Sequence, residues 1–213
     1  MPRQRASLRQ SYTGTVEPIG LEVRTLPKPV TGRVLFGNDR PLEMEIGTGR
    51  GTFLGEEAQS RPDVNFIGIE RARRYWRFAS DRLRRRGCGN VRVILIDAGY
   101  FLREFVPDAT LAAIYVHFPD PWPKKRHHKR RLIQPQFIRE VERTLTPGGR
   151  LQVVTDHPEY FAQIAAVIGS SSLVPSPYRR PATAAHDELV GSNFERKYVR
   201  LGRNPSAVAA VKK

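Results

Sequence analysis

The sequence has one cysteine in 213 residues, so it can form neither an intrachain disulfide nor a cysteine-based zinc site. Cys88 falls in a predicted turn at 87–90, away from the carboxyl ends of the predicted strands. The five histidines show no spacing typical of metal ligands. We therefore expect no metal site and no cysteine nucleophile.

Long hydrophobic runs are also missing. Hydrophobic residues make up 39% of the chain, and no stretch approaches the roughly 20 apolar residues that span a membrane. The first residues, MPRQRASLRQSYTG, are basic and lack the apolar segment of a secretory signal. These absences favour a cytoplasmic protein with no membrane partner.

Acidic residues are scarce beside basic ones. The chain has 36 Lys and Arg against 21 Asp and Glu, which gives a formal net charge of +15. A charge of this size indicates a polyanionic partner, with nucleic acid first and an anionic membrane surface second. It says nothing about the fold.

Alternating apolar runs and helical patterns indicate the architecture. We expect a basic, flexible arm over residues 1–30, with a short ordered stretch near 21–26, and a single domain over 31–213. Strands separated by helices predict an α/β fold with a doubly wound, mainly parallel sheet in three layers. The predicted strands are 42–46, 65–69, 91–96, 111–118 and 151–155, and the predicted helices are 52–59, 72–86, 135–145 and 158–168.

A glycine-rich turn, EIGTGRG at 45–51, follows the first predicted strand. Glycines let the backbone turn sharply and approach a ligand closely, although such a turn alone is weak evidence for a ligand. The next two strands end in Glu70 and Asp97, and parallel strands bring their carboxyl ends to one edge of the sheet. An acidic pocket suits a cationic sulfonium better than a pyrophosphate, so S-adenosylmethionine is favoured over NAD.

The segment FPDPWPKKRHHKRR at 118–131 follows the fourth predicted strand. Its three prolines predict a stiff, non-helical loop that orients Asp120 and Trp122. Asp120 could accept hydrogen bonds from a guanine edge, while Trp122 either packs or stacks on a base. The basic residues from Lys124 to Arg131 are either a solvated charged run or a strip that grips phosphates, and their position beside the loop favours the strip.

The predicted helix 72–86 is rich in arginine. Tyr75, Phe78, Ala79 and Leu83 lie at helical spacing and predict a stripe that faces the core. The arginines either extend an RNA-binding surface or keep the protein in solution, and the sequence does not separate these alternatives.

Several of these motifs together resemble the bacterial tRNA (guanine-N7-)-methyltransferase family, a group of class I S-adenosylmethionine-dependent enzymes. The similarity rests on FPDPWPKKRHHKRR, the following LTPGG turn, TD at 155–156 and the late element SNFE at 192–195, and it extends over residues 42–203. The resemblance implies a seven-stranded Rossmann-like sheet with one antiparallel strand near the end of the chain, for which the region of Val199 is a candidate.

The resemblance also implies roles for individual residues. It implies that Asp120 is the active-site residue and also contacts the cofactor. The implied substrate is tRNA, and the implied target is the variable-loop guanosine at position 46. Cofactor contacts are implied for Glu45, Gly47, Gly49, Glu70 and Asp97. Substrate contacts are implied for Lys124, Asp156, Ser192, Asn193, Phe194 and Glu195. RNA contacts are implied for Arg126, His127, His128, Lys129, Arg130 and Arg131.

Guanine N7 carries an in-plane lone pair and no proton, so its methylation needs no general base. Positioning and electrostatics would then supply the catalysis.

Two alternatives remain open: a methyltransferase for another RNA or a small molecule, and an RNA-binding protein without activity. The chain is expected to act as a monomer or a homodimer.

Overall fold

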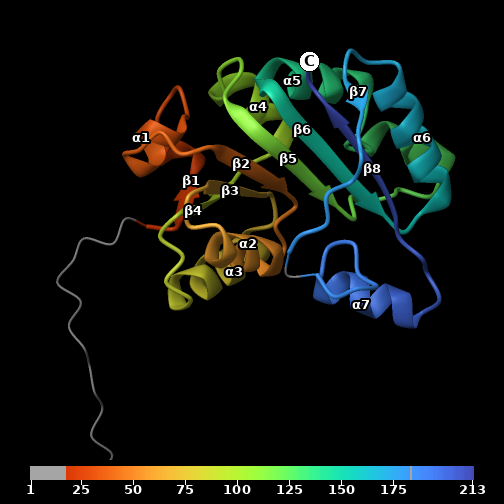
Figure 1. Ribbon diagram of the computed structural model, residues 1–213, viewed down its shortest axis with the longest axis horizontal. Coiled ribbons are helices and arrows are strands. Elements are labelled where there is room, and N and C mark those ends of the chain that lie inside the picture. Colours follow the sequence, from red (N-terminus) through yellow and green to blue (C-terminus); the bar gives the residue numbers. More distant parts are fainter. Residues whose placement is uncertain (1–17, 183) are drawn as a thin grey trace, which may run out of the picture.

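The computed structural model describes residues 18–182 and 184–213, except for the side chain of residue 193 (Figure 1). Within these ranges, eight strands form one sheet in the order β1-β4-β3-β2-β5-β6-β8-β7. The strands are β1 (Gly20–Glu22), β2 (Leu42–Ile46), β3 (Asn65–Glu70), β4 (Val91–Leu95), β5 (Leu111–His117), β6 (Leu145–Thr155), β7 (Val174–Pro175) and β8 (Ser206–Val211).

The sheet is mainly parallel, as predicted. Strands β1 to β6 pair in parallel, while β8 runs antiparallel to both β6 and β7. The helices are α1 (Gly32–Phe36), α2 (Thr52–Ser60), α3 (Arg73–Arg85), α4 (Ala98–Phe105), α5 (Pro135–Thr144), α6 (Pro158–Gly169) and α7 (Asn193–Arg200). Two 3-10 segments, η1 (Val23–Thr25) and η2 (Lys125–Arg130), complete the elements of the described residues.

Two apolar clusters lie on opposite faces of the sheet and make the three layers. One packs Phe101, Phe137 and Ile164 from α4, α5 and α6 against the strands. The other packs Leu54 of α2 and Leu83 of α3 against the opposite face. Figure 1 shows these two groups of helices on either side of the strands. The predicted three-layer α/β fold is confirmed.

The amino-terminal boundary at residue 30 needs correction. Residues Gly20–Glu22 overlap the short ordered stretch that we expected near 21–26. They pair in parallel with β4, and the Val93 amide donates to the Ile19 carbonyl at 2.7 Å. A strand here covers the edge of β4, so the described domain begins before residue 20 and the sheet has eight strands instead of seven. The remaining residues of the predicted arm, 1–17, lie outside the described residues.

The predicted late strand near Val199 is wrong. Val199 lies in α7, whose first turn is capped by Ser192, and the antiparallel strand comes later as β8. Strand β8, with the sequence SAVAAV, lies between β6 and β7 in the sheet. Helix α4 was also not predicted, although Asp97 provides its N-cap by accepting from the Tyr100 amide at 3.0 Å.

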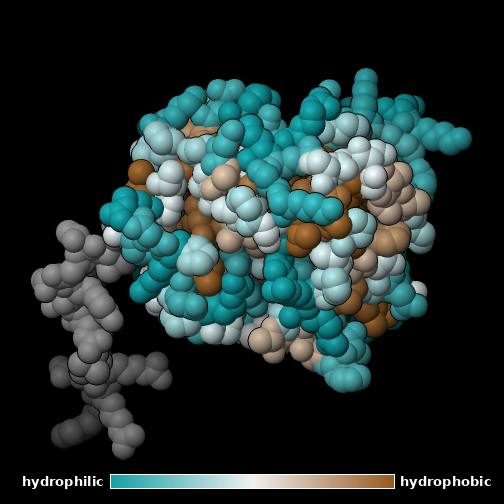
Figure 2. Space-filling view, turned by 45° about the horizontal axis from the view of Figure 1, so that its top comes forward, coloured by the Kyte–Doolittle hydropathy of each residue, from teal (hydrophilic) through white to brown (hydrophobic). Residues whose placement is uncertain are grey.

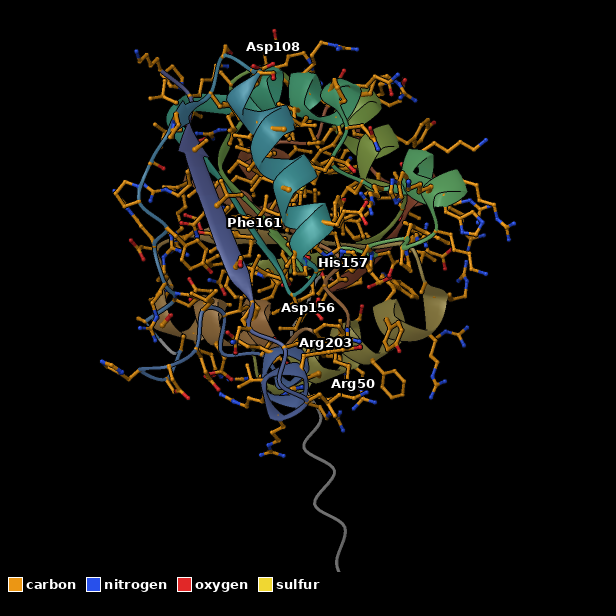
Figure 3. The ribbon with its side chains drawn as sticks, turned by 90° about the vertical axis from the view of Figure 1, so that its right-hand side faces the viewer. Arg50, Asp108, Asp156, His157, Phe161 and Arg203 are labelled. Atoms are coloured by element: carbon orange, nitrogen blue, oxygen red, sulfur yellow. The ribbon has the colours of Figure 1, made fainter. Side chains whose placement is uncertain are left out.

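The order of the strands sets where a site can form. Strand β2 lies between β3 and β5, so the chain turns to one side of β2 for β3 and β4 and to the other for β5 and β6. Parallel sheets bind ligands beyond the carboxyl ends of their strands, at such a switch point. In Figure 3, Asp156 and His157, which follow β6, lie at one end of the sheet, while Asp108 lies at the other.

Candidate active site

The loop between β2 and α2 depends on glycine. Gly47, Gly49 and Gly51 have φ angles of 79°, 56° and 68°, which side chains with a Cβ rarely adopt. The Gly47 and Thr48 amides donate to the Ile69 carbonyl at 2.8 and 3.1 Å, which fixes the loop against the end of β3. At Gly47 a Cβ would meet no atom within 4 Å, so backbone conformation, not crowding, requires this glycine.

Glu70 joins this loop to α3. Its side chain accepts from the Gly49 amide at 2.9 Å and from the Ala72 amide at 2.8 Å, one bond to each carboxylate oxygen. Backbone donors on both oxygens hold the carboxylate in one orientation at the end of β3. Each oxygen keeps a second lone pair that can accept from a ligand hydroxyl.

Glu45 and His117 form a buried pair between β2 and β5. Their side chains are each 5% exposed, with His117 Nδ1 3.2 Å from Glu45 Oε1. Burial, reinforced by Glu70 and Glu57, raises the pKa of Glu45 well above its usual value, and burial lowers the pKa of His117 to about 3. Burial therefore disfavours the charged form of both groups.

Several polar atoms near this pair lack partners among the described residues. Glu45 Oε2, His117 Nε2 and Thr48 Oγ1 are buried and make no hydrogen bond there. Buried polar groups normally make hydrogen bonds. Three buried polar atoms without a partner in the described part of the chain, in β2, β5 and the glycine loop, are consistent with a polar ligand at this place. His117 was missed in the sequence because it ends an otherwise apolar strand.

Asp97 stands at the end of β4 and is exposed. One of its oxygens caps α4 by accepting from the Tyr100 amide, so Asp97 has a structural role. The Ile96 amide donates to the Glu70 carbonyl at 3.2 Å, so the ends of β3 and β4 are held together. Glu45 near the end of β2, Glu70 at the end of β3 and Asp97 just after β4 thus lie at the carboxyl ends of three neighbouring strands.

The loop after β5 is non-helical, as its prolines predict. Phe118 and Trp122 have φ angles of 51° and 44°, a left-handed conformation that is uncommon for bulky residues. The Phe118 amide donates to the Val154 carbonyl at 2.7 Å, which anchors the start of the loop to β6. Asp120 is exposed, and its Oδ2 lies 3.4 Å from Nη2 of Arg71.

Trp122 packs within the same loop. Its ring meets His127 edge-on at 5.8 Å, and the Arg130 guanidinium lies 5.1 Å from the ring centroid. Trp122 is half-buried, while Lys124, Arg126, Lys129 and Arg130 are exposed around it. The loop and the 3-10 segment η2 therefore form one packed unit with an exposed basic surface.

Arg131 departs from the predicted RNA-binding strip. Its side chain is 1% exposed, and its Nε donates to the Pro121 carbonyl at 2.7 Å. Its Nη1 donates to Gln163 Oε1 at 2.6 Å, and its Nη2 contacts Glu159 at 3.3 Å. A buried guanidinium with these partners cannot reach a phosphate, so the RNA-binding assignment of Arg131 is wrong. It ties the loop to α6 instead.

Helix α7 brings the late SNFE element to this loop. The Phe194 ring lies 4.9 Å from the Phe118 ring, between centroids. Ser192 caps α7 by accepting from the Glu195 amide at 3.1 Å, and the side chain of Asn193 lies outside what the structure describes. The Glu195 carboxylate accepts from the amides of Leu189, Val190 and Gly191 and is buried.

Glu195 therefore does not face a substrate, contrary to the role implied by resemblance. Its carboxylate accepts from three backbone amides and so holds the segment before α7 in place.

Asp156, at the end of β6, pairs with Arg203 at 3.0 Å, and Figure 3 shows both near His157. Sequence reasoning missed Arg71 and Arg203, since an ion pair between distant segments has no local signal.

The apolar stripe predicted for α3 is only half correct. Ala79 and Leu83 are fully buried, but Tyr75 and Phe78 are 44% and 48% exposed. Trp76 takes the core-facing place instead, and its Nε1 donates to the Val93 carbonyl at 2.9 Å. On the face of the molecule that Figure 2 shows, hydrophilic residues predominate and hydrophobic residues are exposed in separate spots.

Within the described ranges, no group of three or more His, Cys, Asp or Glu residues could hold a metal ion. None of the helices described there has the length and apolar character to cross a membrane. Cys88 is buried, and burial raises the pKa of its thiol.

The chain is similar to known methyltransferases in sequence and in fold. The Methyltransf_4 family model, described as "Putative methyltransferase", matches residues 39–206. The chain is 37% identical over 183 residues to the tRNA (guanine-N(7)-)-methyltransferase of Alkalilimnicola ehrlichii, a match that covers 86% of this chain and 77% of the relative. It is also 37% identical over 185 residues to the enzyme of the same name from Rhodopirellula baltica, covering 83% and 68%.

Solved structures share the fold at low sequence identity. A SAM-dependent methyltransferase from Aquifex aeolicus has a TM-score of 0.57 and 14% identity over 81% of this chain and 82% of that chain. The 16S rRNA methyltransferase KamB has a TM-score of 0.60 and 13% identity, over 88% and 100% of the two chains.

Proposed function

Because this chain belongs to the tRNA (guanine-N(7)-)-methyltransferase family, we propose that it transfers the methyl group of S-adenosylmethionine to N7 of a guanosine in tRNA. One observation supports this most directly. The acids at the carboxyl ends of β2, β3 and β4 lie at the same end of the sheet as the Asp120 loop, and the Arg71–Asp120 ion pair links the segment after β3 to that loop. A donor site and a site for a nucleobase therefore adjoin.

The residues present fit the cofactor. S-adenosylmethionine supplies an electrophilic methyl group on a cationic sulfonium when it is bound. In our proposal Glu70 accepts from the ribose hydroxyls with its remaining lone pairs, and Asp97 contacts the adenine edge. Gly47 and Gly49 allow the close approach of the backbone, and the unsatisfied Glu45 Oε2 forms a hydrogen bond with a polar group of the ligand.

Asp120 has the central role in the proposed chemistry. Its exposed carboxylate accepts from the N–H groups of the guanine and stabilises the positive charge that forms on the base. No general base is required because N7 carries no proton. The bulky residues in left-handed conformations on either side of Asp120 hold the loop in one shape, which favours a defined orientation of the base.

The remaining contacts belong to the tRNA. We assign phosphate contacts to Lys124, Arg126, His127, His128, Lys129 and Arg130, which precede the buried Arg131. We assign guanosine contacts to Asp156, Ser192, Asn193 and Phe194, because Phe194 already touches the loop through Phe118. The target is the variable-loop guanosine at position 46, and the enzyme acts in the cytoplasm as a monomer or a homodimer.

This function is tested by incubating the purified protein with methyl-labelled S-adenosylmethionine and an unmodified tRNA transcript. Label should enter the transcript and should be absent from a matched transcript that carries adenosine at position 46. Label in neither transcript would contradict the activity. Equal label in both would keep the activity and reject the position.

A further inference from the structure

We propose that one side of α3, together with Arg50 of the glycine loop, is a platform for unpaired nucleotides of the RNA. This α3 platform consists of Arg50, Arg71, Arg74, Tyr75 and Phe78. It rests on the proposed function and deepens it, since it assigns part of the substrate to a surface outside the FPDPW loop and η2.

The geometry of α3 puts these residues on one side. Arg74 and Tyr75 lie four and three residues before Phe78 in α3, a spacing that aligns side chains along a helix, and Arg71 lies just before the N-cap Ala72. This side faces the glycine loop, because Arg82, one turn further, donates to Thr52 Oγ1 at 3.1 Å. Arg71 contacts Asp120 at one end of the platform. The platform therefore continues directly from the proposed active-site loop.

Two exposed aromatic rings distinguish this side from an ordinary solvated helix face. Tyr75 and Phe78 are 44% and 48% exposed although the helix buries Ala79 and Leu83 completely. Nucleobases stack on exposed aromatic side chains without regard to sequence, and interleaved arginines contact the phosphates. An aromatic pair beside arginines has the chemistry of a surface that binds single-stranded nucleic acid.

The arginines of the platform are loosely held. The guanidinium carbons of Arg50 and Arg74 lie 5.9 and 5.8 Å from the centroid of Phe78, near the outer limit of a cation–π contact. Asp81, the single acid of α3, pairs instead with Arg84 and Arg85 at the far end of the helix. Charge near the platform is thus predominantly positive, which matches a polyanion.

The platform also has a suitable place. Figure 3 shows Arg50 at the same end of the molecule as Asp156 and Arg203, opposite Asp108. A guanosine at Asp120 needs its neighbouring nucleotides to leave the stack, and the platform lies beside that point. Continuity with the site and a net charge of +15 favour RNA over a protein or a membrane as the occupant.

Anisotropy titration of a labelled, unmodified tRNA transcript tests the proposal, with the enzyme saturated with S-adenosylhomocysteine. The Tyr75→Ala/Phe78→Ala variant should raise Kd about tenfold and leave the log–log salt slope unchanged, because stacking releases no counterions. The Arg50→Gln/Arg74→Gln variant should raise Kd and reduce that slope by about one to two. Thermal melting should show that both variants, altered only at exposed residues, stay folded.

The matched control is Arg84→Gln/Arg85→Gln, which removes the same charge from the far end of the same helix. It should weaken binding less than Arg50→Gln/Arg74→Gln. Wild-type affinity in the aromatic variant would overturn the proposal. If the aromatic variant keeps its tRNA affinity but loses binding to phosphatidylglycerol vesicles, the platform binds a membrane surface and the proposal is overturned. If the wild type makes no 7-methylguanosine while the aromatic variant still loses affinity, the proposed function fails and the platform stands.

Discussion

The acids on the two halves of the sheet differ in what holds them. After β3 and β4, backbone amides fix Glu70 and Asp97, and a buried histidine contacts Glu45 after β2. After β5 and β6, Asp120 and Asp156 pair with arginine side chains that are 69% and 57% exposed. Backbone donors are preorganised, whereas an ion pair with an exposed arginine exchanges more easily, above all at Asp120, whose side chain is 69% exposed against 10% for Asp156.

This difference suits two kinds of ligand. A cofactor of fixed shape benefits from carboxylates that are already oriented. A tRNA needs carboxylates that are available once it arrives, and an exposed arginine can leave an aspartate to meet a phosphate. We therefore expect substitutions on the β2–β4 half to change cofactor affinity, and those on the β5–β6 half to change turnover or tRNA affinity.

The largest effect is expected at Asp120. Asp120→Ala should lower kcat about a thousandfold, because it removes the group that orients the base and stabilises its charge. The substitution should leave the melting temperature unchanged, since the side chain is 69% exposed. Initial rates with both substrates saturating measure this, and near-normal turnover would remove Asp120 from the active site.

Arg131 and Arg130 provide a sharp contrast between neighbours. Arg131→Met should lower the free energy of unfolding by about 3 kcal/mol, because it leaves the Pro121 carbonyl, Gln163 and Glu159 without their partner. Arg130→Met should change it by less than about 0.5 kcal/mol and weaken tRNA binding instead. Urea denaturation and tRNA titration separate the two, and equal stability of both variants would contradict the assignment of Arg131 as a buried tie.

Glu70→Gln tests the β2–β4 half. It should raise the Kd for S-adenosylmethionine about tenfold, since a charged acceptor of hydrogen bonds becomes neutral. The Kd for tRNA should stay the same. Isothermal titration measures both, with Glu104→Gln on α4 as the control, since its carboxylate is half-buried and contacts Lys28 and Arg103 instead of the glycine loop. A change confined to tRNA affinity would reverse the division between the two halves.

The buried pair in this half predicts a dependence of stability on pH. His117 has a pKa of about 3 when folded and about 6.5 when unfolded, so below pH 6.5 the unfolded chain takes up a proton that the folded protein does not. Stability from this group is complete above pH 6.5 and is lost as the pH falls towards 3.

Compared with the wild type, His117→Gln should therefore lose less stability on acidification, by about 1 kcal/mol per pH unit below 6.5. Urea denaturation at pH 7 and at lower pH measures this difference. A constant difference across the series would show that folding does not lower the pKa of His117.

The smallest effect is expected at the ion pair of Asp156. Arg203→Ala frees the carboxylate that we assign to the guanosine, so KM for tRNA should fall by about twofold to threefold, within the range of such pairs. Steady-state kinetics with varied tRNA measures it. A rise in KM would instead mean that Arg203 itself binds the RNA.

Much of the fold could be predicted from the sequence because buried parallel strands are short continuous apolar runs. Strands β2 and β3 begin where the LEMEI and NFIGI runs predict, and the acids that follow them mark the site. The three-residue β1 has no such pattern, because its pairing with β4 alone makes it a strand.

Side-chain environments were harder to predict than elements. Arg130 and Arg131 are adjacent and identical in type, yet only the packing of α6 against the loop buries one of them. Tyr75 and Phe78 follow the spacing of a core stripe, but the sheet contacts α3 along Trp76, Ala79 and Leu83. Such choices depend on tertiary contacts that local spacing does not contain.

The identity of the methylated atom tests the account most directly. After reaction of the wild-type protein with S-adenosylmethionine and unmodified tRNA, nuclease digestion and mass spectrometry identify the modified nucleoside. The account predicts 7-methylguanosine as the only new methylated nucleoside, in an amount that approaches one per tRNA. A methyl group on a guanine ring position other than N7, or on another base, would contradict it.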